Sequence, residues 1–174
     1  MFEKKSVGLD EAMGALNVML EEIKSNPEKY WQYACIGIVD EVGNLKAFAR
    51  MDSHAVTSVD IAIRKARTAA LWRRDITEMN AWLADRGRSV EDYVPGSTRT
   101  PGGVAIVDPK DIGSQLREAE LAEQHSKSAA EVDQYYGKIA IGGIGVAAAG
   151  PWQLDLEIAN MGLKYIQDKI WPEK

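Results

Sequence analysis

The sequence predicts one α/β domain, of the α+β kind, in which an antiparallel sheet carries packed helices. Segments with helical spacing flank segments with strand character, and the strand-like segments follow one another along the chain. The chain lacks the βαβ alternation and the Gly-x-Gly-x-x-Gly turn of a doubly wound nucleotide fold. Its 174 residues can bury a core without a disulfide or a metal.

The first half of the chain predicts a helix followed by a β-hairpin. Apolar side chains recur at helical spacing from about Leu9 to Lys24, and Asn26-Pro27 ends the pattern. Tyr33–Val39 and Leu45–Ala49 have strand character, and the residues between them are typical of a turn. We therefore expect these two strands to pair with each other.

Two helices, two strands and a final helix are expected after the hairpin. The helices run from a cap at Thr57 to about Arg73 and from about Thr77 to Ala84. The strands are Val104–Val107 and the Gly-rich segment Lys138–Ala149; Gly150-Pro151 then opens the last helix. That helix is expected to bury Leu154, Ile158, Met161 and Tyr165. Because the strands are consecutive, we expect an antiparallel sheet with helices on one face.

A helical insertion at about 108–136 separates the last two strands. Seven acidic and three basic residues give it a charge of −4. A solvated surface helix, an oligomer contact and a lid over a pocket all fit this pattern. The insertion belongs to the same single domain, 1–174.

Composition excludes several classes of function. With 21 Lys and Arg against 26 Asp and Glu, the net charge of −5 argues against nucleic-acid binding, which needs a basic face. The longest apolar stretch, residues 139–150, is too short to span a bilayer, and no secretory signal core opens the chain, so we expect a cytoplasmic protein without membrane contact. Cys35 is the single cysteine, so neither a disulfide within the chain nor a Cys-rich metal site is expected.

The candidate chemistry lies between the hairpin and the next helix. His54 falls in a loop at the rim of the sheet, where an imidazole can act as a general acid or base or as an axial haem ligand; an exposed loop histidine is the alternative. Arg50 can clamp a carboxylate, or pair with Asp52 or Asp60 instead. Lys65 follows Ser58 by about two helical turns, so both side chains can face one side, although a surface lysine is the simpler reading.

Glycines and aromatic residues form a second group of candidates. The helix start at Gly150 offers unpaired backbone N–H groups to a ligand carboxylate, as every helix start does. Gly102 and Gly103 can let backbone approach a ligand, or can form an ordinary turn. Pocket aromatics can come from Trp72, Trp82, Trp152, Tyr93, Tyr135 and Tyr136, although such side chains more often form cores or subunit interfaces.

Several short motifs, in the same order, resemble the GlcG/HbpS family. They are Ile38-Val39-Asp40-Glu41-x-Gly43-Asn44-Leu45 with Ala47-Phe48-Ala49-Arg50-Met51-Asp52, Ser58, Lys65-Ala66-x-Thr68-Ala69, Pro101-Gly102-Gly103-Val104 and Gly143-Ile144-Gly145-Val146. The resemblance implies a profilin-like fold with an antiparallel sheet of about five strands flanked by helices, assembled as homo-oligomers. His54, the insertion and the run from Ala147 to Trp152 depart from the family pattern.

The resemblance implies two functions. The first is a cofactor-independent lyase that acts on a small aromatic acid in catabolism, such as 4-hydroxylaminobenzoate, and releases ammonia to give a dihydroxybenzoate. Its catalytic residues would be His54, Arg50, Lys65 and Asp52, and its substrate-binding residues Met51, Ser58, Gly102, Gly103, Gly150 and Trp152. The second is a protein that binds haem or another small ligand, with His54 or a neighbouring oxygen donor as the axial ligand. An assembly protein that uses the insertion is a third class.

Overall fold

The computed structural model describes residues 5–52, 56–90, 94–109 and 139–172. Their strands form one antiparallel sheet in the order β2-β1-β4-β3. The strands are β1 (Cys35–Asp40), β2 (Leu45–Arg50), β3 (Gly103–Val107) and β4 (Ala140–Ala147). The described residues thus form four strands, against the five or so expected, and the predicted hairpin is β1–β2.

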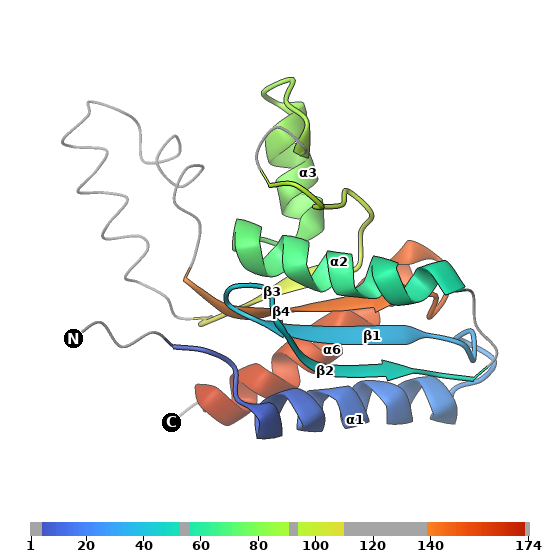
Figure 1. Ribbon diagram of the computed structural model, residues 1–174. Coiled ribbons are helices and arrows are strands. Elements are labelled where there is room, and N and C mark those ends of the chain that lie inside the picture. Colours follow the sequence, from blue (N-terminus) through green and yellow to red (C-terminus); the bar gives the residue numbers. More distant parts are fainter. Residues whose placement is uncertain (1–4, 53–55, 91–93, 110–138, 173–174) are drawn as a thin grey trace.

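Helices cover both faces of this sheet, so the expectation of helices on one face is wrong. On one side α1 (Leu9–Ser25) and α6 (Trp152–Ile170) pack together, and α2 (Val56–Trp72) lies on the other side (Figure 1). Along β1, Ile36 and Ile38 join the core of α1 and α6, whereas Cys35 and Val39 contact α2. A central strand that is apolar on both sides needs cover on both faces.

Glycines in the sheet let α2 approach the strands closely. A Cβ atom on Gly143 would lie 2.3 Å from the carbonyl oxygen of Ala66, and one on Gly145 would lie 2.1 Å from that of Ala62. The helix turns small alanine side chains toward the same strands. The glycines of β4 on this face are therefore explained by helix packing.

The short helix α3 (Ile76–Ala84) lies beside α2 and stands away from the sheet (Figure 1). It builds a small core of its own from Ile76, Met79, Leu83 and Val90. Trp72 and Trp82 flank this core, with ring centroids 5.9 Å apart in an edge-to-face arrangement. These two aromatics therefore pack with α3.

The buried face of α6 is shifted by one position from the predicted stripe. Asp155, Ile158, Ala159, Gly162 and Ile166 are buried, whereas Leu154, Met161 and Tyr165 lie at the margins. The cause is close packing: a Cβ atom on Gly162 would lie 2.6 Å from the sulfur of Met19 in α1. A pattern that counts only large apolar residues misses a stripe built from an acid, an alanine and a glycine.

Two sequence expectations fall largely outside the described residues. Nearly all of the insertion at about 108–136 lies there, as do His54 and His125, so these stay predictions. Within the described ranges, no helix has both the length and the apolar character needed to cross a membrane.

Candidate functional site

One end of the sheet gathers the elements that carry most predicted site residues. Cys35, the first residue of β1, pairs with Arg50 at the end of β2 and with Ala147 at the end of β4. Beyond the strands, the Met51 N–H donates to the Ala34 carbonyl (3.0 Å). The helices α2 and α6 begin at this same end (Figure 1). We call the surface formed by residues 31–35, 50–52 and 147–152 the sheet end.

Arg50 is the exposed cation of the sheet end. Its alternatives were ion pairs with Asp52 or Asp60, but Asp60 instead pairs with Arg64 at 2.8 Å. No ion pair joins Arg50 to another residue in the described ranges. Burial raises the pKa of the neighbouring Cys35 thiol, and the charge of Arg50 partly opposes that shift. The guanidinium is thus accessible to an anionic ligand.

Lys65 is buried, so the reading of it as a surface lysine is wrong. Its side chain donates from Nζ to Asp155 Oδ2 (2.8 Å) and to the carbonyl of Val146 (2.7 Å). Only 1% of Lys65 and 5% of Asp155 are exposed. Ser58, on the same helix, is buried as well, in agreement with the predicted spacing.

The electrostatics of this pair are dominated by its burial. Removal from water lowers the pKa of Lys65 and raises that of Asp155, and the mutual attraction of the two groups opposes both shifts. Asp155 Oδ1 also accepts a hydrogen bond from the N–H of Ala149 (2.9 Å), and the N–H of Ala148 supports the carboxylate as well. The ion pair therefore joins α2, the end of β4 and the first turn of α6.

Asp155 was not among the predicted site residues. From the sequence, a ligand carboxylate was expected to bind the backbone N–H groups near Gly150. In the structure the carboxylate of Asp155 accepts a hydrogen bond from the N–H of Ala149 in this turn. The available signal was an acid inside the apolar stripe of the final helix, four residues after Pro151. An acid at such a position must be paired when it is buried.

The Pro101-Gly102-Gly103 motif lies against this ion pair. Gly102 has a φ of +104°, and a Cβ atom on it would lie 2.8 Å from Asp155 Cβ and 2.9 Å from Lys65 Nζ. A Cβ atom on Gly103 would lie 2.5 Å from the carbonyl oxygen of Lys65. Within the described residues, the close backbone approach predicted for this motif is to the chain's own lysine and aspartate.

The remaining predicted residues divide between core and surface. Met51 packs partly buried against the core of α1 and α6, and Gly150 is buried against Leu154. Asp52 and Trp152 are exposed at the sheet end, Trp152 by 46%. Arg50, Asp52 and Trp152 are thus exposed at the end of the sheet, whereas Lys65, Ser58, Gly102 and Gly103 are buried.

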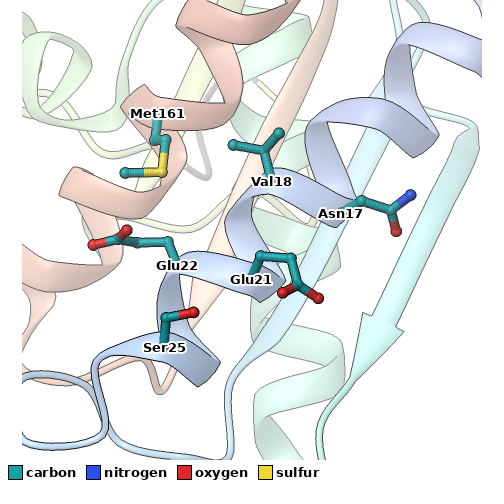
Figure 2. A pocket seen from close by; sticks show the side chains of 6 residues that line it. All are labelled: Asn17, Val18, Glu21, Glu22, Ser25 and Met161. Carbon is teal, nitrogen blue, oxygen red and sulfur yellow. The ribbon is translucent and has the colours of Figure 1, made fainter.

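A concavity lies between α1 and α6, lined by residues outside the sheet end. Figure 2 shows this shallow groove, with Glu21 and Glu22 on α1 and Met161 on α6. It is lined by Asn17, Val18, Glu21, Glu22, Ser25 and Met161, none of which was a predicted site residue. In the part of the chain that the structure describes, no three metal-ligating side chains come together.

The fold and the sheet end define a profilin-like α/β protein with Arg50, Asp52 and Trp152 exposed at one end of its sheet, and sequence comparison gives its family. Residues 7–117 match the family model described as "Haem degrading protein HbpS-like", so the chain belongs to the HbpS-like family. It is 39% identical over 80 residues to Protein GlcG of Escherichia coli K12 and equally to that of E. coli O6:H1 strain CFT073. That alignment covers 45% of this chain and 59% of each GlcG protein.

Solved structures share the fold at low sequence identity. A double mutant of Streptomyces reticuli HbpS superposes with a TM-score of 0.68 at 22% identity, covering 94% of this chain and 89% of HbpS. Klebsiella pneumoniae ORFY gives 0.66 at 19% identity, covering 95% of this chain and 94% of ORFY. PduOC in complex with haem gives 0.62 at 18% identity, covering 92% of this chain and 94% of PduOC. At these identities the likeness establishes the fold.

Proposed function

We propose that this protein binds a small planar anion at the sheet end, and that haem is this ligand. The observation that carries the proposal is the different environment of two cations, Lys65 and Arg50. Asp155 neutralises Lys65 in the interior, whereas Arg50 stays exposed at the sheet end, where the indole of Trp152 is 46% exposed as well. A cation next to an apolar aromatic surface suits a flat ring that carries carboxylates. The family description and the haem complex of PduOC support the choice of haem.

The residues of the sheet end have separable roles in this proposal. Arg50 binds a haem propionate, because a guanidinium forms two parallel hydrogen bonds with a carboxylate. Trp152 covers apolar ring surface that would otherwise face water. His54, four residues beyond Arg50 in the sequence, would bind the haem iron. Bound haem would supply an iron centre whose properties depend on that ligand.

A haemin titration tests this proposal. We expect the Soret band to shift on binding, the shifted band to be lost in His54→Ala, and the affinity to fall about tenfold or more in Arg50→Gln, because that change removes a charge-assisted contact. His125→Ala is the control for the imidazole. Arg64→Gln is the control for the charge, because it removes another exposed arginine, which pairs with Asp60 on α2. A wild-type spectrum identical to free haemin overturns haem binding.

A second candidate, a lyase, uses the same carboxylate anchor without a cofactor, and the exposure of Arg50 beside Asp52 favours it. In 4-hydroxylaminobenzoate the carboxylate binds Arg50, and His54 protonates the N–OH oxygen so that water leaves. One water then adds to the electron-poor ring, and a second hydrolyses the resulting imine to release ammonia and a dihydroxybenzoate. The net reaction consumes one water. Asp52 would orient His54 or the attacking water.

Ammonia release from 4-hydroxylaminobenzoate tests the lyase. His54→Ala should lower kcat by about 10²–10⁴-fold, the usual contribution of general acid catalysis. Arg50→Gln should chiefly raise KM, because it removes a contact made before the chemical step. Ammonia release that is unchanged in a folded His54→Ala variant contradicts this candidate.

A further inference from the structure

Two aromatic rings that the sequence patterns did not single out lie together at the sheet end. The rings of Trp31 and Tyr33 stack with centroids 5.6 Å apart and planes 24° from parallel. Trp31 is 47% exposed. An indole stabilises a fold most when it is buried. A stacked indole with half its surface in water therefore leaves a flat apolar surface available for contact with a ligand.

Hydrogen bonds hold the backbone segment that carries Trp31. The Trp31 N–H donates to the carbonyl of Ala149 (2.8 Å) in the turn before α6. The next side chain, Gln32, donates to the carbonyl of Ile23 near the end of α1 (2.7 Å). The preceding Tyr30 is buried, and its hydroxyl donates to Glu157 (2.8 Å). The backbone that carries the ring is therefore held in place, so a ligand has little backbone ordering to impose.

Charged and aromatic neighbours lie on both sides of this segment. On one side Ala34 accepts the N–H of Met51, which follows Arg50 directly. On the other side Ala149 lies three residues before Trp152, which is 46% exposed. The segment thus runs between an exposed cation and a second half-exposed indole. Asp52 is the exposed acid of the same surface.

We infer that Trp31 and Tyr33 form a stacking platform for the planar aromatic ring of a carboxylate ligand that Arg50 binds. This inference rests on the proposed function and sharpens it. It names the ligand class as a flat aromatic ring with a carboxylate at its edge, which includes both porphyrins and small aromatic acids. A saturated carboxylate of the same charge would lose the stacking contribution.

Two carboxylates of different shape test the platform. Binding of 2-naphthoate and of cyclohexanecarboxylate is measured by calorimetry, with haemin as a third probe. We expect the wild type to bind 2-naphthoate about tenfold or more tightly than cyclohexanecarboxylate, because a well-formed aromatic stack is worth that factor. Retained haemin binding with no 2-naphthoate binding would identify a porphyrin as the ring, and the reverse would identify a small aromatic acid.

Variants of Trp31 separate the platform from the anchor. Trp31→Ala should abolish the preference for the aromatic probe and leave cyclohexanecarboxylate binding unchanged, whereas Arg50→Gln should weaken both. Trp31→Leu keeps apolar bulk without a flat ring and should behave like Trp31→Ala. Leu45→Ala, a 50% exposed residue at the other end of the hairpin, is the matched control. Circular dichroism confirms that each variant is folded.

The outcomes distinguish the platform from the proposed function. If Arg50→Gln weakens binding while both Trp31 variants keep the aromatic preference, the platform is wrong and the proposed function stands. If neither planar probe binds the wild type, both are overturned. If Trp31→Ala lowers the mass of the particle in solution without changing ligand preference, the surface is a contact between copies of the chain, which also overturns the platform.

Discussion

The buried pair of Lys65 and Asp155 gives the sharpest stability prediction. Asp155→Asn keeps the shape of the side chain and an oxygen that can accept from Ala149 N–H, but removes the charge. The side chains of the pair are only 2% and 7% exposed, so the lysine charge left behind has little access to water. Removing one partner of a buried ion pair costs about 3–5 kcal/mol, and we expect about 3 kcal/mol because the amide oxygen retains one hydrogen bond.

Lys65→Met should cost a similar amount, since it leaves the carboxylate of Asp155 with backbone donors alone. The double variant Lys65→Met/Asp155→Asn carries neither charge and keeps both volumes, so its loss should be smaller than the sum of the two single losses by about 2 kcal/mol or more. This coupling between the two substitutions is the result that would identify a buried ion pair.

Urea unfolding followed by circular dichroism measures the cycle, with free energies from linear extrapolation. For a domain of this size a loss of 3 kcal/mol corresponds to a fall in Tm of about 6–12 °C. Single losses below about 1 kcal/mol, or losses that add up in the double variant, would refute the buried ion pair. Lys164→Met is a control, because Lys164 pairs with Asp168 on the exposed side of α6 and should change stability little.

Three further changes probe the fold around the site. Gly102→Ala should destabilise the protein by about 1–3 kcal/mol, because the residue has a positive φ and its Cβ would press on the ion pair; an unchanged urea midpoint would contradict this. Gly145→Ala should cost more than Gly87→Ala, since a Cβ at 145 meets α2 backbone, whereas at 87 no atom lies within 4 Å and only the positive φ of 56° opposes the change; equal thermal midpoints would refute the packing explanation. Hydrogen bonds from Lys29 and then Tyr30 hold the pKa of Glu157 below its ordinary value of 4.5. A depressed carboxyl pKa stabilises the fold above pH 4.5 and loses that effect as the pH falls through the folded-state pKa, so the Tm gap between wild type and Glu157→Gln should shrink from pH 7 to pH 3; a constant gap would show that the charge is irrelevant.

Sequence patterns predicted the elements well wherever a single period dominates. The boundaries of α1, the β1–β2 hairpin and α6 follow from apolar spacing, turn residues and the Gly-Pro helix start. The cover on both sheet faces was missed, because it depends on small residues such as Gly143 and Gly145 whose role is to admit a helix. The predicted buried face of α6 differs from the observed one for the same reason, since Asp155 and Gly162 are not counted as apolar residues.

The candidate site was predictable in part. Arg50 follows from its place at the end of a predicted strand and from the family motif, and it is exposed there. Lys65 was found by the motif, but its partner Asp155 is 90 residues away and only the folded chain brings them together. Trp31 carries no periodic signal, because it lies in the segment between α1 and β1 where backbone hydrogen bonds set the structure.

The location of the ligand tests the central claim most directly, because the structure offers two surfaces that could receive one. Hydrogen–deuterium exchange of the wild type, with and without haemin, would report protection along the chain. We predict slower exchange in residues 31–35, 50–52 and 147–152 at the sheet end. Protection confined to residues 17–25 and the neighbourhood of Met161, the groove of Figure 2, would contradict the account.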